Sequence, residues 1–133
     1  MRAARLRRWT DVLLLVVFGA VIGLTGAFVQ AQRALVPTPW GTVTIPWGIV
    51  LVWVALVAAI RAGAWMTGTR WGAWGVLVGW LVVTVLASAE SPSGDVALSG
   101  GGRQLTYLLV GVVLGSAAAS LPLPLSQRNR AGR

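Results

Sequence analysis

The sequence contains no cysteine, no histidine and no lysine, and only three acidic residues among 133 positions. The absence of cysteine excludes disulfide bonds, thiolate metal sites and cysteine nucleophiles. The absence of histidine excludes imidazole catalysis and imidazole metal ligation, and the absence of lysine excludes Schiff-base chemistry. We therefore expect no catalytic residue, no metal site and no cofactor, and we expect that the protein is not an enzyme.

Charged side chains are scarce in general, because 11% of the residues are charged whereas 56% are hydrophobic. The mean hydropathy is +0.78. A soluble globular domain has roughly one quarter of its residues charged. The composition therefore predicts an integral membrane protein without a separate soluble domain.

Four long apolar runs indicate helices that cross a membrane, since a helix of about 20 residues spans the ~30 Å hydrocarbon core. Proline, glycine and charged residues separate the runs. The fold class predicted for residues 1–133 is all-α, a polytopic membrane protein with four transmembrane helices in one compact bundle. The predicted spans cover about 11–30, 46–66, 71–89 and 104–122, and a basic cytoplasmic tail covers 126–133.

The first run has a competing interpretation as a cleaved secretory signal peptide. Its arginine-rich head fits the start of such a peptide, and residues 29–31 offer small side chains for cleavage. The run is longer than the usual apolar core of about 7–15 residues, and three further runs follow it. We therefore favour a first helix that is retained.

The distribution of arginines predicts the orientation in the membrane. All 11 basic residues are arginines, and nine of them lie in the head, the loop between the second and third runs, and the tail. With four crossings these segments share one side, which the positive-inside rule places in the cytoplasm. We expect a multi-pass protein of the cell membrane with both termini cytoplasmic. The nine arginines are Arg2, Arg5, Arg7, Arg8, Arg61, Arg70, Arg128, Arg130 and Arg133.

The net charge of +8 raises the question of which anionic partner the chain attracts. The arginines flank apolar spans, and no separate basic domain exists that would bind nucleic acid. We expect the partner to be a lipid bilayer with anionic headgroups.

Most of the eight tryptophans lie at the predicted ends of the spans. An indole ring is stable at the headgroup boundary, with its apolar body in lipid and its N–H in water. Trp53 and Trp80 are different, because each lies within a span and its N–H needs a backbone carbonyl or, for Trp80, the hydroxyl of Thr84. We interpret both as core residues, with a ligand-facing surface for a lipid or isoprenoid as the alternative. The predicted interface anchors are Trp9, Trp40, Trp47, Trp65, Trp71 and Trp74.

Glycine pairs stand four residues apart in three of the four predicted spans. This spacing places both glycines on one side of a helix, where the missing side chain lets another backbone approach closely. The pairs therefore predict helix-packing seams, whose partner is the same chain, a second copy or another protein. The glycines are Gly19 and Gly23, Gly75 and Gly79, and Gly111 and Gly115.

The three acids avoid the middle of every span, which argues against an ion-coupled transporter. Asp11 follows Thr10 at the predicted start of the first helix, where a carboxylate caps free backbone N–H groups. Glu90 and Asp95 lie in an outer loop with Arg103, where solvated ion pairs contribute little. A weak Ca²⁺ site at these two carboxylates is the disfavoured alternative, because so few ligands are present.

Two short segments at the end of the second run and the start of the third, Arg61–Trp65 and Thr69–Trp74, are followed by Ser93–Val96, a glycine-rich stretch and Tyr107. Together they resemble an uncharacterised family of small four-span actinobacterial integral membrane proteins. The resemblance covers nearly the whole chain and implies the fold, but it implies no activity, cofactor or site. It selects four positions for a first test, namely Arg61, Arg70, Trp74 and Asp95.

Taken together, these features favour a non-catalytic accessory or scaffold subunit that packs against another membrane protein or itself. The alternative is a small oligomeric transporter or lipid-handling protein in which Trp53 and Trp80 line the pathway. An intramembrane enzyme is the least favoured hypothesis, because a serine or threonine without a base is a poor nucleophile.

Overall fold

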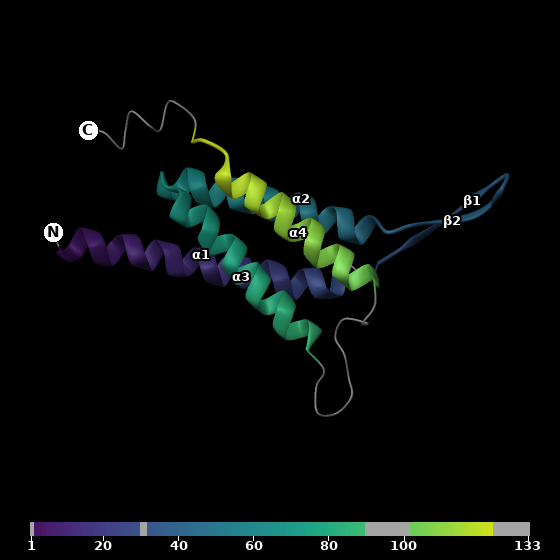
Figure 1. Ribbon diagram of the computed structural model, residues 1–133, viewed down its shortest axis with the longest axis horizontal. Helices are drawn as coiled ribbons and strands as arrows, with labels where there is room; N and C mark the ends of the chain where they lie inside the picture. Colours follow the sequence, from purple (N-terminus) through teal and green to yellow (C-terminus); the bar gives the residue numbers. More distant parts are fainter. Residues whose placement is uncertain (1, 30–31, 90–101, 124–133) are drawn as a thin grey trace.

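A computed structural model describes residues 2–29, 32–89 and 102–123 of the chain. The described residues form four helices and one β-hairpin (Figure 1). The predicted compact all-α bundle of four helices is confirmed, and the hairpin is an addition that the sequence analysis did not predict. The elements are α1 (Arg2–Val29), β1 (Ala34–Thr38), β2 (Gly41–Ile45), α2 (Trp47–Thr67), α3 (Arg70–Ser88) and α4 (Gly102–Ser120).

Three of the four helices are long and apolar enough to cross a membrane by length and composition. They are α2, α3 and the part of α1 from Trp9 to Val29. The apolar part of α4, Leu105–Ser120, is shorter. All of α4 has 19 residues, which corresponds to a helix of about 28 Å.

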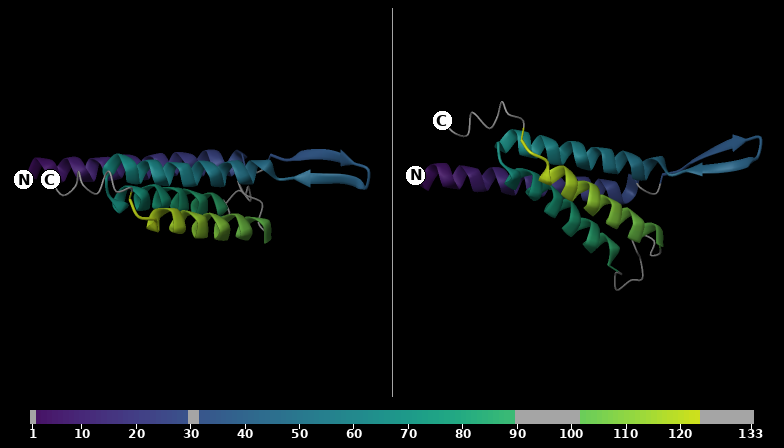
Figure 2. Two further views of the ribbon diagram at one scale, coloured as in Figure 1. Left: turned by 90° about the horizontal axis from the view of Figure 1, so that it is seen from above. Right: turned by 45° about the horizontal axis from the view of Figure 1, so that its top comes forward.

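The helices run alternately up and down and pack in two layers. In the left view of Figure 2, α1 and α2 form one layer and α3 and α4 form the second. Helix α3 contacts each of the other three, whereas α4 packs against α2 and α3. Helix α1 starts, and α2 and α4 end, at one end of the bundle, and the hairpin projects from the opposite end (Figure 1).

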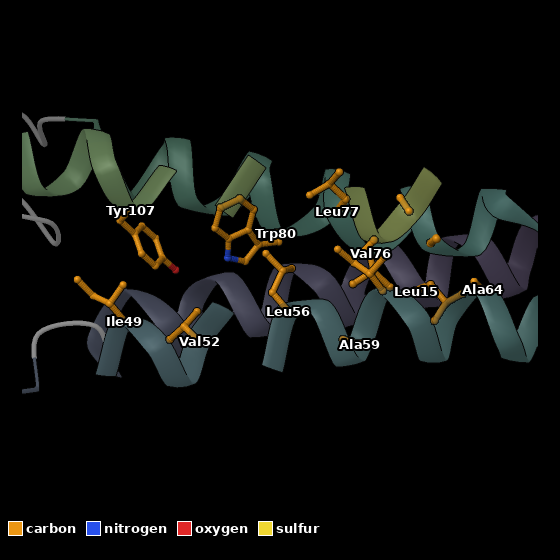
Figure 3. Packing of buried hydrophobic residues seen from close by; sticks show 14 residues of the cluster. Leu15, Ile49, Val52, Leu56, Ala59, Ala64, Val76, Leu77, Trp80 and Tyr107 are labelled. Carbon is orange, nitrogen blue, oxygen red and sulfur yellow. The ribbon is translucent and has the colours of Figure 1, made fainter. Parts of the chain in front are cut away.

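Large side chains from α2, α3 and α4 fill the centre of the bundle (Figure 3). Trp80 and Tyr107 have no exposed surface, and their tilted rings lie with centroids 5.8 Å apart. Leu56, Ile60 and Val76 are equally buried around them. The middle of the bundle is therefore filled by side chains.

The glycine pairs of α1 and α3 bring two backbones into direct contact. A Cβ atom added to Gly19 would overlap the carbonyl oxygen of Val76, and one added to Gly79 would overlap that of Val16. A Cβ on Gly23 would lie 2.9 Å from the carbonyl oxygen of Trp80. We call this contact between α1 and α3 the glycine seam. In lipid, association relies on such van der Waals contact, because lipid is as apolar as the side chains.

The glycines of α4 accept side chains instead of a backbone. A Cβ on Gly111 would overlap the indole ring of Trp80, and one on Gly115 would overlap Leu77 and lie 3.3 Å from Ile60. All six glycines of the predicted seams thus face neighbouring elements of the same chain.

Helix α1 begins at Arg2, well before the predicted start at residue 11. Alanine and arginine are strong helix formers, so residues 2–8 extend the helix beyond its apolar run. Asp11 is therefore preceded by helical residues on its N-terminal side, where the backbone N–H groups already have partners. The predicted capping role of Asp11 is wrong, because a cap must flank the first turn.

The hairpin occupies a segment that the sequence analysis interpreted as an irregular break because of its prolines. Strands β1 and β2 pair in antiparallel register, with Val36 opposite Val43. Pro37 is tolerated because both strands lie at an edge of the two-stranded sheet. Pro39 and Trp40 form the turn, and Gly41 follows it at φ 126°, which glycine adopts readily.

Replacing Gly79 by Ala tests the glycine seam, with Gly102→Ala as the matched control because a Cβ at Gly102 meets no atom. We expect G79A to lower the free energy of unfolding by about 1–3 kcal/mol, since the added methyl group forces α1 and α3 apart. SDS titration in mixed micelles, followed by circular dichroism, measures this difference. Equal stability of G79A and G102A would contradict the seam.

Candidate functional site

One cavity lies where the base of the hairpin meets the first turns of α2 and α4. Its volume is about 410 Å³. We call it the hairpin pocket. Its lining consists of Arg33, Thr44, Pro46, Ile49, Val50, Trp53, Thr106 and Tyr107.

Local structure explains how these residues come together. Pro46 directly precedes α2, a position at which its missing N–H costs nothing. The indole N–H of Trp53 donates to the backbone carbonyl oxygen of Tyr107 at 3.3 Å and so joins α2 to α4. Thr106 donates its hydroxyl proton to the carbonyl oxygen of Gly102 at 2.8 Å, one turn earlier in α4. The pocket is thus built by three elements with a polar tie across its floor.

The hairpin pocket combines polar and apolar groups, because Arg33 and Thr44 on the hairpin side are polar and exposed whereas its α2 residues are apolar. Arg33 is exposed, and among the described residues it has no ion-pair partner. Ile49, Val50 and Trp53 supply the wall on α2. A cationic group beside apolar side chains can hold an amphiphile, but it offers no nucleophile or base.

Of this lining, the sequence analysis identified only Trp53 as a candidate. Arg33 is one of the two arginines outside the nine that predict the orientation, and Tyr107 entered only through the family resemblance. The one available signal was that Tyr107 is the single tyrosine of the chain and lies in an apolar run. Neither residue carries a spacing pattern that would link it to the other.

The structure places Trp53 and Trp80 differently. Trp53 lines the hairpin pocket, whereas Trp80 lies wholly in the core against Tyr107 and Gly111. The ligand-facing alternative therefore does not apply to Trp80. The hydroxyl of Thr84 donates to the backbone carbonyl oxygen of Trp80 at 2.7 Å and accepts no hydrogen bond from the indole N–H, so the predicted bond from that N–H to Thr84 is wrong.

The indole N–H of Trp80 and the hydroxyl of Tyr107 point toward one another in the core (Figure 3). Within the described part of the chain, neither atom has a hydrogen-bond partner. A buried polar atom without a partner costs free energy, about 1–3 kcal/mol in proteins. Together with Thr84, this pair makes up the buried polar side chains of a largely apolar core among the described residues.

Arg61 binds the C-terminal end of α4. Its guanidinium donates to the carbonyl oxygens of Ala118, Leu121 and Pro122 at 3.3, 3.4 and 3.5 Å. The last carbonyls of a helix lack partners within the helix, and the helix dipole makes this end negative. Arg61 therefore caps α4 from α2, a role that the sequence analysis did not predict.

A second cavity of about 490 Å³ lies between α1 and α2, near the end at which α1 starts. Asp11 is its only charged residue, and Phe18 and Met66 contribute to its apolar lining. Within the described residues, no group of three histidines, cysteines, aspartates or glutamates could hold a metal ion.

The predicted anchors are exposed to different degrees. Trp65 and Trp71 near helix ends, and Trp9 at the start of the apolar part of α1, expose about two thirds of their surface, and Trp47 and Trp74 expose less. Trp40 is 96% exposed at the turn of the hairpin, so its predicted place at the end of α2 is wrong. The hairpin separates it from α2.

The predicted topology arginines fall into three groups. Arg61 and Arg70 lie at the α2–α3 end, with Arg70 exposed. Four others belong to the start of α1, and their side chains are outside the described residues. The following predicted residues also lie outside them: Glu90, Asp95, Arg128, Arg130 and Arg133.

Replacing Arg61 by Gln tests the cap on α4, and Arg70→Gln removes an equal charge from the same end of the bundle as the matched control. We expect R61Q to lower the free energy of unfolding by about 1 kcal/mol more than R70Q. Thermal unfolding in detergent, followed by circular dichroism, measures both variants. The cap would be refuted by equal losses, since a general charge effect would then suffice.

Comparison with known proteins identifies a family and no activity. The family described as a family of unknown function (DUF6113) matches the chain over residues 1–133. No match is found among the curated proteins or among the solved structures. Because the match spans the whole sequence, the chain, with its apolar helical bundle, belongs to this family, DUF6113.

Proposed function

We propose that the protein is a non-catalytic accessory or scaffold subunit of the membrane that packs against another membrane protein or against itself. The observation that carries this proposal is the β-hairpin, which projects beyond the helical bundle with its side chains largely exposed (Figure 2). A hairpin of two strands is at best marginally stable alone in water. A partner surface would supply the missing packing.

The hairpin has an apolar face that suits such a partner. The opposed pairs Ala34–Ile45 and Val36–Val43 lie two residues apart in register, so their side chains share one face. Trp40 at the turn adds a nearly fully exposed aromatic ring. Aromatic residues are enriched among those that dominate protein interfaces.

The glycine pairs already pack within the chain, so a partner has to contact a different surface. Their close contacts are already made within the chain, between α1 and α3 and at α4. The outer surfaces of the helices carry large aliphatic side chains suited to lipid. The hairpin is thus the feature best suited to recognise a protein.

For the orientation, we propose that α4 crosses the membrane with the other three helices. It lies along α2 over its whole length, tied by Trp53 near the start and by Arg61 near the end. The proposed topology has four crossings with the arginines on the cytoplasmic side, both termini in the cytoplasm and the hairpin outside, as the positive-inside rule favours.

One observation favours the alternative, a small transporter or lipid-handling protein, and that is the place of Trp53 in the hairpin pocket. Transport through a single bundle is disfavoured because Trp80 and the glycine seam close its middle. Binding of a lipid at the side of the bundle needs no such path.

A photo-crosslinking amino acid at position 40 tests the accessory role in intact membranes, with position 113 as the control because Val113 is exposed on α4. We expect a discrete adduct with a membrane protein or a second copy from position 40 and none from position 113. Adding Val36→Thr and Val43→Thr keeps strand propensity and removes the apolar face, so the adduct should fall several-fold. If position 40 yields no adduct and the protein remains monomeric, the accessory role is wrong.

A further inference from the structure

We propose that the hairpin pocket is a binding site for an anionic phospholipid, which places its phosphate at Arg33 and the upper part of a chain along the α2 wall. This site deepens the lipid-handling alternative and does not depend on the accessory role. Its ligand is defined by chemistry as a phosphate group joined to an aliphatic chain.

The cationic end of the site is Arg33, at the base of the hairpin. A guanidinium binds phosphate through two parallel N–H donors, which makes it a stronger and more specific partner than a point charge. Arg33 has no acidic partner among the described residues, so its charge is available. Thr44 in β2 lines the same pocket and offers a hydroxyl donor, whereas the proton of Thr106 is already given to Gly102.

The apolar end of the site is the first part of α2. Ile49, Val50 and Trp53 lie within two turns after Pro46, which extends the wall about 10 Å below the start of the helix. Val50 is 53% exposed, so the pocket opens toward the surrounding lipid. A lipid can enter sideways with its chain still in the bilayer.

The order of these groups matches a lipid and not a soluble anion. Arg33 and Thr44 precede α2 in the chain and lie on the hairpin side, while the apolar residues lie deeper in the bundle. A free phosphate would use only the rim, and a cationic amphiphile would be repelled by Arg33. A volume of about 410 Å³ holds a headgroup and a short length of chain.

The test uses the full chain in nanodiscs of phosphatidylcholine with a minor fraction of phosphatidylglycerol, and native mass spectrometry counts the phosphatidylglycerol that stays bound. We expect Arg33→Gln to weaken retention roughly tenfold, because it removes charge-assisted hydrogen bonds. Arg33→Lys keeps the charge and should retain more lipid than Arg33→Gln. Arg70→Gln removes the same charge at the far end and should leave retention unchanged. Equal loss in R33Q and R70Q would overturn the site, since it would show attraction by net charge alone.

A second variant tests the pocket independently of the charge. Val50→Trp fills the wall from an exposed position, so the core is not disturbed, and it should lower lipid retention while unfolding at the same temperature as the wild type. Undiminished retention in V50W would overturn the proposed position of the chain. Inorganic phosphate at millimolar concentration should not displace the lipid, because the chain contributes to binding. Displacement by inorganic phosphate would identify a site for the free ion and refute the lipid.

Failure of this site and failure of the accessory role are separable. The crosslink at position 40 probes the turn of the hairpin, whereas the number of retained lipids in R33Q probes the base of the hairpin. A missing adduct at position 40 therefore does not change the lipid retention expected for R33Q. Each result therefore addresses one proposal.

Discussion

Close contact between the backbones of α1 and α3 is the constraint on which the other packing depends. In water, burial of apolar surface would hold these helices together, but in lipid that driving force is absent. Gly19 and Gly79 let the carbonyl groups of the opposite helix approach where a side chain would stand. The approach aligns α1 along α3, and a neighbouring face of α3, with the side chains of Trp80 and Leu77, packs against Gly111 and Gly115 of α4. The contact of α1 with α3 therefore positions α3 for its contact with the glycines of α4.

Hydrogen bonds connect α2 and α4 in addition to the packing of their side chains. Trp53 donates to α4 near its start, and Arg61 donates to the carbonyls at its end. The bond from Trp53 is favourable next to lipid, because water does not compete for its donor and acceptor there. The hairpin pocket lies beside the first tie, at the end of the bundle where the helices give way to strands. Its amphipathic lining follows from that position, with a charged loop residue above and apolar helix residues below.

The sequence predicted the features that depend on local pattern and missed those that depend on contact between distant segments. The apolar runs predicted the helices, and the four-residue spacing of glycines identified Gly19 in α1 and Gly79 in α3. Each of these signals can be recognised within a single helix. Prolines concealed the hairpin, since Pro37 excludes a central strand but not an edge strand. The apolar pattern did not reveal the true start of α1, because residues 2–8 are helical but rich in arginine. The hairpin pocket was beyond reach, because Arg33 and Tyr107 are brought together only by the packing of α2 against α4.

The account as a whole proposes that a glycine-sealed bundle crosses the membrane with its hairpin outside and its α2–α3 turn in the cytoplasm. The absence of cysteine allows a direct measurement, since a single introduced thiol has no background. The measurement is labelling of Thr42→Cys and Thr69→Cys in intact cells with a maleimide that does not cross membranes. The account predicts that T42C reacts at once and that T69C reacts only after the cells are lysed. Labelling of T69C in intact cells, or protection of T42C until lysis, would contradict it.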